Sequence, residues 1–136
     1  MKVFITYSSE DELVAKKVAD TLKAAGLDAW YDKYEIMPGE NWAEKIAQGL
    51  KESTAMVVLL TPNALKSDQV GWSIDYALGD HAYNWRLIPV LLGSPEEFQN
   101  NNFPWILRRL KSITLPDRGN SEEGLKQIAQ ALKEVA

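Results

Sequence analysis

The sequence predicts an α/β fold, a three-layer sandwich in which helices cover both faces of a parallel sheet. Two observations lead to this prediction. Short segments rich in β-branched and aromatic residues alternate with longer segments of helical periodicity along the 136-residue chain. One short segment, residues 55–60 (AMVVLL), is apolar throughout, which is typical of a strand buried on both faces at the centre of a parallel sheet.

Five segments are expected to form strands, because each is short and is bounded by Ser, Asp, Pro or Gly. They are residues 2–7, 28–31, 55–60, 87–92 and, with a weaker pattern, 112–115. Helices lie between them in this scheme, and each parallel pairing then needs a right-handed crossover.

Helical periodicity is clearest in residues 11–25, where apolar residues recur at helical spacing and Gly26 follows at the position of a C-terminal stop. Residues 43–50 and 125–132 repeat the i, i+3, i+4, i+7 pattern of a helix with one buried stripe. Residues 63–80 are less regular, and we expect a helix there with an irregular first turn.

Residues 93–111 interrupt the alternation with three consecutive Asn residues and the cluster Phe103-Pro104-Trp105. We expect a long loop there that is packed by its own aromatic residues. The length of the chain corresponds to one domain, residues 1–136, with no room for a second core.

Composition excludes several functions. The net charge of −4 argues against broad capture of nucleic acid or of an anionic membrane, since both need a basic surface. Cysteine is absent and His81 is the single histidine, so disulfides, thiolate catalysis and a metal site are not expected. The sequence contains neither a signal peptide pattern nor a stretch of ~20 apolar residues, and we expect a cytoplasmic protein without membrane partners.

Ligands in open α/β sheets bind outside the carboxyl ends of the strands, so the loops after the strands are the candidate sites. The first loop begins Tyr7-Ser8-Ser9 and lacks glycine, which excludes a dinucleotide-binding turn and a P-loop. Its serines and Asp11 are explained either as the N-cap of the following helix or, for Tyr7 and Ser8, as ligand contacts. The third strand ends in Thr61 rather than in the Asp that a phosphoacceptor receiver domain needs.

The second loop, residues 32–42, is longer than the ~2–6 residues typical of such connections and contains Ile36, Met37 and Pro38. Exposed apolar residues on a long loop indicate contact with a partner. Alternatively, Ile36 and Met37 fold back on the core, and Pro38-Gly39 forms only a turn.

Taken in order, the segments FITYSSEDE, GLDAWYD, PGENW, VVLLTPN, IDYAL and RLIPVLL resemble the Toll/interleukin-1 receptor (TIR) domain of the bacterial type, strongly over residues 1–92. The resemblance implies a flavodoxin-like fold with five parallel strands in the order 2-1-3-4-5. It also implies association with other TIR domains, as a homo-oligomer or filament, through the second loop at Ile36, Met37, Pro38 and Gly39. Many bacterial members act in antiphage defence or as effectors, cleaving NAD at the nicotinamide–ribose bond and in some cases cyclising the ADP-ribose product.

Cleavage of that bond develops positive charge on the ribose, which a preorganised carboxylate stabilises. TIR enzymes supply a Glu in a W-x-x-x-E pattern on the helix after the third strand. Aligning residues 74–78 (IDYAL) with the tail of that pattern places Ser73 at the Glu position and Gln69 at the Trp position. Either the catalytic acid is lost at Ser73, or a gap shifts the register and Asp75 takes the role. We favour loss, because Asp75 lies roughly 200° around the helix from Ser73.

The resemblance therefore predicts an NAD-cleaving or cyclising TIR domain that is catalytically impaired. Its NAD-like ligand, a substrate rather than a cofactor, would contact side chains of the loops and of the helix after the third strand. The candidate contacts are Tyr7, Ser8, Asp32, Trp42, Gln69 and Trp72. Packing explains Trp42 equally well and is the favoured explanation for Trp72. The alternative is a non-enzymatic TIR module that works by self-association or by docking to another TIR protein.

Overall fold

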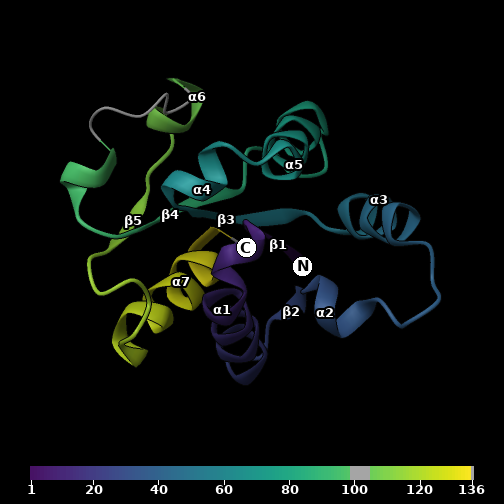
Figure 1. Cartoon of the computed structure of the whole chain (residues 1–136), viewed down its shortest axis with the longest axis horizontal. Coiled ribbons are helices and arrows are strands. Elements are labelled where there is room, and N and C mark those ends of the chain that lie inside the picture. The colour runs from purple at the N-terminus through teal and green to yellow at the C-terminus, as the bar shows by residue number, and fades with distance from the viewer. Residues whose placement is uncertain (99–104, 136) are drawn as a thin grey trace.

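A single sheet of parallel strands organises the computed structural model, which describes residues 1–98 and 105–135 (Figure 1). The strand order is β2-β1-β3-β4-β5, which confirms the order expected from the resemblance. The strands are β1 (Lys2–Thr6), β2 (Asp28–Trp30), β3 (Ala55–Leu60), β4 (Leu87–Leu92) and β5 (Ile113–Leu115).

Helices cover both faces of the sheet, so the predicted three layers are confirmed (Figure 1). The α-helices are α1 (Glu12–Ala24), α2 (Asp32–Glu35), α3 (Trp42–Glu52), α4 (Pro62–Leu65), α5 (Asp68–Gly79), α6 (Trp105–Arg108) and α7 (Glu122–Val135), and two 3-10 helices are η1 (Ser9–Asp11) and η2 (Pro95–Phe98). None of the helices in the described residues is long and apolar enough to cross a membrane.

Alternation along the strands divides the apolar residues into two cores. In β1, Val3 and Ile5 pack with α1 and α7 on one face of the sheet. Phe4 points to the other face, where it packs with α3, α4 and α5. All six residues of β3 are fully buried, because this strand contributes to both cores, as its continuous apolar run predicts.

The segment from 63 to 80 is not one helix with an irregular start but two helices. The Thr61 hydroxyl accepts a hydrogen bond from the Ala64 amide (3.1 Å) and caps α4, and the Ser67 hydroxyl accepts one from the Val70 amide (3.3 Å) and caps α5. Two N-caps six positions apart thus begin two separate helices, because each satisfies backbone N–H groups that have no partner within the helix.

The expected loop at 93–111 is wrong in part, because η2 and α6 lie within it. Phe98 and Leu107 are buried in the core beneath α3, α4 and α5. The segment therefore packs on the main core rather than only on its own aromatic residues. Asn100–Asn102 and Phe103-Pro104 lie outside the described residues.

Close contact between β2 and α3 depends on Gly49. The Trp30 ring stacks on Phe4 with a centroid separation of 4.9 Å and lies against the backbone of α3 at Gly49. A Cβ at position 49 would lie 2.3 Å from Cε2 of Trp30, well inside van der Waals contact. A glycine is therefore required in the middle of α3, although glycine is a poor helix former.

We expect Gly49→Ala to lower the free energy of unfolding by about 1–3 kcal/mol, because the indole must move out of a packed core. Gly71→Ala is the matched control, since position 71 also lies inside a helix and has no atom within 4 Å of the added Cβ. That change should raise stability by up to ~1 kcal/mol. Urea denaturation measures both variants, and an equal gain in both would show that the Trp30 contact carries no strain.

Candidate functional site

The candidate site lies where the loops after β1, β2 and β3 meet. The connection that leaves β1 runs through α1 on one face of the sheet, and the connection that enters β3 runs through α3 on the other face. The two connections therefore diverge between the neighbouring strands β1 and β3. In doubly wound sheets such a reversal opens a crevice at the carboxyl ends of the strands. Two adjoining pockets occupy this region.

The first cavity, here called the polar pocket, has a volume of about 200 Å³. Side chains from the segments after β1 and β2 and from the starts of α1, α3 and α5 surround it. Its lining residues are Tyr7, Ser9, Glu12, Asp32, Lys33, Trp42 and Gln69. It therefore combines carboxylates, an ammonium group, hydroxyls and an indole in one small space.

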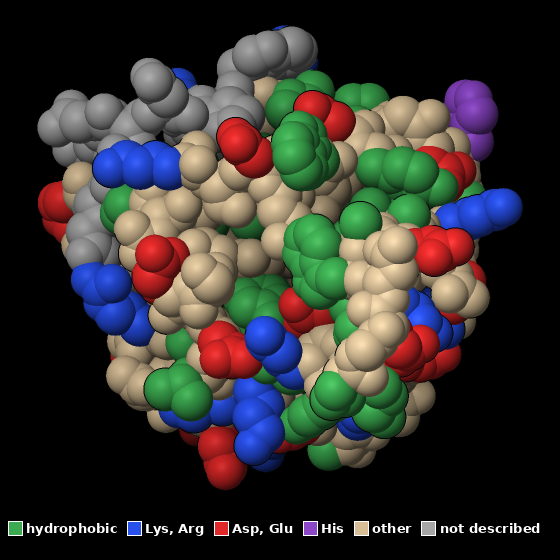
Figure 2. Space-filling model, turned by 45° about the vertical axis from the view of Figure 1, so that its right-hand side comes forward, with side chains coloured by type: hydrophobic (Ala, Val, Ile, Leu, Met, Phe, Trp, Pro, Cys, Tyr) green, Lys and Arg blue, Asp and Glu red, His purple; other side chains and the backbone are tan. Residues whose placement is uncertain are grey.

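The second cavity, the apolar pocket, has a volume of about 180 Å³ and lies between α3 and α5. It is lined by Trp42, Ala43, Ile46, Ala47, Leu50, Gln69, Trp72 and Ser73. Trp42 and Trp72 are 48% and 68% exposed, a large apolar surface to leave in water. Figure 2 shows the side of the molecule that lies to the right in Figure 1, with hydrophobic side chains reaching the surface between charged ones.

Tyr7 and Asp32 form a fixed pair on the wall of the polar pocket. The Tyr7 hydroxyl donates to Oδ1 of Asp32 at 2.5 Å, and the Lys33 amide donates to the same oxygen at 2.9 Å. Burial raises the pKa of Tyr7 well above its ordinary value, and the bond to Asp32 raises it further. The phenol therefore stays protonated and holds the carboxylate in one orientation.

A row of three tyrosine rings extends from Tyr7 away from the pocket. Tyr7 lies 5.8 Å from Tyr31 between ring centroids, and Tyr31 meets Tyr34 edge to face at 4.8 Å. The Tyr34 hydroxyl donates to Oδ1 of Asp20 on α1 at 2.7 Å, and Lys23 of the same helix lies over its ring. The start of the second loop is thus attached to both β1 and α1.

Ser73 and Gln69 both line the apolar pocket, one helical turn apart on α5. Ser73 is 1% exposed, and its hydroxyl donates to the carbonyl oxygen of Gln69 at 2.9 Å. Asp75 is exposed and lines neither pocket. The alternative in which Asp75 acts as the acid therefore has no support from its position.

Ser8 does not line either pocket, unlike the other candidate ligand contacts. It is 5% exposed, and its hydroxyl donates to Glu10. The N-cap explanation holds for position but not for hydrogen bonding. Ser8 and Asp11 are the N-cap residues of η1 and α1, and acidic residues occupy both first turns, but neither side chain makes a capping hydrogen bond. Asp11 instead accepts from the Thr61 hydroxyl at 2.7 Å, and burial raises the pKa of this carboxyl.

The second loop combines the two explanations considered for it. Ile36 packs against the core, as the alternative explanation expected, whereas Met37 is 62% exposed. Pro38 and Gly39 form the expected turn, with Gly39 at φ +89° and the Glu40 amide bonded to the Met37 carbonyl at 3.1 Å. The candidate interface thus reduces to Met37, Pro38 and Gly39, which are all exposed.

Sequence reasoning missed three residues of the polar pocket: Ser9, Glu12 and Lys33. Each lies within six positions of a strand end, so the rule that loops after strands bind ligands includes them. Polar and charged residues are common in such loops, however. Only the folded structure, which brings Ser9, Glu12 and Lys33 into one pocket, distinguishes these three from the others. No group of three or more acidic or histidine side chains suited to a metal ion occurs in residues 1–98 and 105–135.

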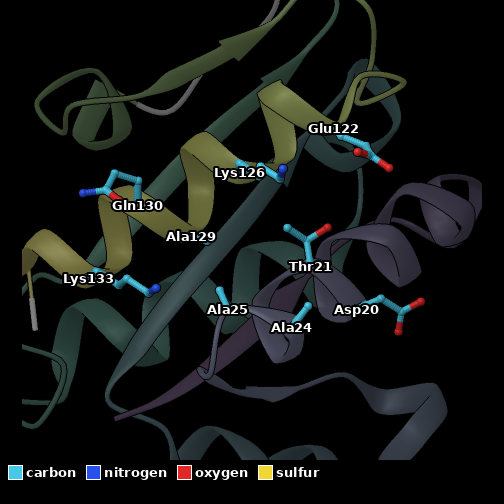
Figure 3. A pocket seen from close by; sticks show the side chains of 9 residues that line it. All are labelled: Asp20, Thr21, Ala24, Ala25, Glu122, Lys126, Ala129, Gln130 and Lys133. Carbon is cyan, nitrogen blue, oxygen red and sulfur yellow. The ribbon is translucent and has the colours of Figure 1, made fainter.

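A separate groove runs between α1 and α7, across the sheet from the apolar pocket, with a volume of about 530 Å³ (Figure 3). Its lining residues are Asp20, Thr21, Ala24, Ala25, Glu122, Lys126, Ala129, Gln130 and Lys133. Figure 3 shows Lys126 and Lys133 extending from α7 toward α1. All its charged lining residues are exposed, so it holds no desolvated group of the kind that chemistry requires.

The chain belongs to the TIR domain family, whose sequence pattern matches residues 3–129. The TIR domain of the Toll-related receptor TRR-2 from Hydra magnipapillata has the same fold, with a TM-score of 0.71 and 20% identity over 96% of this chain and 97% of that one. The resemblance drawn from the sequence motifs is therefore confirmed.

Two archaeal relatives are similar in sequence. A probable 2′ cyclic ADP-D-ribose synthase, TcpO of Methanobrevibacter olleyae, is 31% identical over 65% of this chain and 26% of its own length. The NAD(+) hydrolase TcpA of a Theionarchaea archaeon is 24% identical over 98% of this chain and 39% of its own length. The chain thus spans about a quarter to two fifths of these relatives.

All five tyrosines have a raised pKa, which predicts a specific loss of stability in alkali. The hydrogen bond to Asp20 raises the pKa of Tyr34 from 10.0 to about 12, and burial is the main cause for the other four. The folded chain holds these protons more tightly than the unfolded chain. The contribution of the tyrosines to stability should therefore be constant below pH ~10 and fall as the pH rises toward 12 and beyond.

Phenolate absorbance during alkaline titration measures this effect, with the same chain in concentrated urea as the control. The native tyrosines should ionise at higher pH than the denatured ones. Coincident titration curves would contradict the hydrogen bonds of Tyr7 and Tyr34.

Proposed function

We propose that this chain binds NAD in the two adjoining pockets and cleaves it slowly or not at all. The observation that carries the proposal is the position of Ser73 and Gln69, which line the apolar pocket beside Trp42 in a member of the TIR domain family. The family resemblance assigns these two positions to a Glu and a Trp. The names of TcpO and TcpA, a cyclic ADP-ribose synthase and an NAD(+) hydrolase, support NAD as the ligand.

A serine at position 73 explains the expected loss of rate. Its hydroxyl is neutral and already donates to the Gln69 carbonyl, so it offers no full charge to a ribose that becomes cationic. Binding depends on other groups, which the pockets retain: an indole, an apolar wall and hydroxyl and carboxylate oxygens. We propose a cytoplasmic location, since a chain without cysteine suits a reducing compartment. The proposed role in bacterial antiphage defence or signalling rests on the family resemblance alone.

Restoring a carboxylate is the direct test. We expect Ser73→Glu to raise NAD cleavage by ~10²–10³-fold, the usual contribution of one preorganised electrostatic group. Ser73→Asp should recover less, because its side chain is one methylene shorter and the geometry at the anomeric carbon is demanding. The rate of nicotinamide release measures both effects, and circular dichroism checks that each variant is folded.

Two controls separate the outcomes. Ser73→Ala should leave the rate at its starting value, and Asp75→Asn should change little in either background, because Asp75 lines neither pocket. A folded Ser73→Glu variant with no gain in rate would favour the non-enzymatic module. Cleavage by the unmodified chain that Asp75→Asn abolishes would identify Asp75 as the acid.

Self-association is the second candidate function, and the exposure of Met37 favours it. The neighbouring turn at Pro38-Gly39 presents this side chain at the tip of the second loop. A flexible apolar side chain in that position suits contact with another TIR domain.

Met37→Ala should weaken self-association without lowering the melting temperature, because an exposed side chain contributes little to the core. Ile36→Ala is the matched control from the same loop, and it should lower the melting temperature by several degrees, since Ile36 packs against the core. Analytical ultracentrifugation over a range of concentrations measures association. A fall in melting temperature for Met37→Ala with unchanged association would contradict the interface.

A further inference from the structure

Lys33 is the one basic side chain among the described residues that line the two pockets. The other charged residues of the lining, Glu12 and Asp32, are acidic. The segment after β1 adds no positive charge, since residues 7–13 read YSSEDEL. The pyrophosphate of NAD carries two negative charges, and a lysine ammonium is a common phosphate partner. Lys33 is therefore the lining residue suited to the phosphates of the proposed ligand.

The ion pair that Lys33 makes with Glu12 is weak enough to be replaced. The Lys33 ammonium lies 3.6 Å from Oε1 of Glu12, and the two side chains are 58% and 50% exposed. Exposed ion pairs contribute little to stability, because water screens the charges and two long side chains lose freedom in forming them. Separation of the two groups therefore costs the folded chain little.

The backbone of Lys33 is fixed, whereas its side chain can move. The Lys33 amide donates to Oδ1 of Asp32 at 2.9 Å, and the Tyr7 hydroxyl donates to the same oxygen. A lysine ammonium stands on a flexible four-carbon stem, so it can change partner by rotation within that stem alone. The start of the second loop thus keeps its position while the charge moves.

The arrangement of the pockets brings a phosphate close to Lys33. Trp42 and Gln69 line both cavities, so a base in the apolar pocket has its ribose at the polar pocket. The phosphate of a nucleotide is joined to the ribose through a single carbon. A ribose at the polar pocket therefore places that phosphate within reach of the side chains in its lining.

From these contacts we infer that Lys33 leaves Glu12 and binds the pyrophosphate when NAD enters the site. Glu12 then acts as a competitor of the ligand, because it holds the same ammonium group in the free chain. This inference rests on the proposed function, since it assigns the phosphate contact of the same site.

Substitutions of the two partners should change NAD affinity in opposite directions. We expect Lys33→Met to weaken NAD binding about tenfold, as the loss of one charged phosphate contact predicts. Glu12→Gln should strengthen it about two- to fivefold, because an exposed ion pair no longer holds the ammonium. Lys33→Arg keeps the charge and should retain most of the affinity. Calorimetry on the full chain measures each value, and circular dichroism checks that each variant is folded.

Nicotinamide riboside is the ligand control, because it has the base and ribose of NAD without a phosphate. Lys33→Met should not weaken its binding, and Glu12→Gln should not strengthen it. Added salt should weaken NAD binding less in Lys33→Met than in the unmodified chain.

The matched protein controls are Lys45→Met and Glu44→Gln, because Lys45 and Glu44 are charged residues of α3 that line neither pocket. Lys45 also forms an ion pair, at 3.0 Å from Glu40. Both variants should bind NAD as the unmodified chain does.

Three results would overturn the inference while leaving the NAD site in place: unchanged NAD affinity in Lys33→Met, an equal loss for NAD and the riboside in that variant, or weaker NAD binding in Glu12→Gln. The last two would show that the ion pair only supports the structure of the pocket. If the folded, unmodified chain binds neither NAD nor the riboside, the proposed function fails, and the inference fails with it.

Discussion

Parallel pairing of the strands is the constraint on which the rest of this structure depends. Each strand must run in the same direction as its neighbours, so the chain crosses a face of the sheet after every strand. The loops that leave the strands consequently gather at one edge. Tyr7, Asp32 and Gln69, which are far apart in the sequence, line one small cavity for this reason. β3 makes the arrangement possible, because it is apolar enough to be buried beneath both layers of helices.

Folding and chemistry depend on different residues in this chain. The hydroxyl of Ser73 bonds to its own helix, so α5 is complete without a carboxylate at that position. The charged groups of the pockets come instead from the loops and helix starts after β1 and β2, where Tyr7 and Lys33 hold two carboxylates in place. The serine at position 73 is therefore compatible with an intact sheet, with both cores and with the other half of the site.

The sequence predicts the features that depend on local pattern. The apolar run of β3 and the amphipathic repeat of α7 identify both elements, and the order of the strands follows from the family resemblance. The division between α4 and α5 was not predicted. In the sequence, Ser67 could equally be a polar residue inside one long helix, and only the hydrogen bond from the Val70 amide to its hydroxyl identifies it as the N-cap of α5. The burial of Phe98 in the main core depends on contacts distant in the sequence.

The sequence likewise predicted part of the candidate site. Tyr7, Asp32, Trp42 and Gln69 were candidates, and they meet in the polar pocket. Glu12 was not a candidate, because a single acid at a helix start is equally explained by the helix dipole. Only the folded arrangement places it in the same pocket as Asp32 and beside Lys33.

The turn at the tip of the second loop has a consequence for the entropy of association. Met37 and Glu40 bond to each other twice, through the Met37 amide to the Glu40 carboxylate (2.8 Å) and the Glu40 amide to the Met37 carbonyl (3.1 Å). Glu40 is also 3.0 Å from Lys45, and the Asn41 side chain caps α3 immediately afterwards. These contacts restrict the backbone around Met37 in the folded chain. A partner that binds this tip would meet a turn that is already ordered, which lowers the ordering cost of ~1–2 kcal/mol per residue that a flexible loop adds to association.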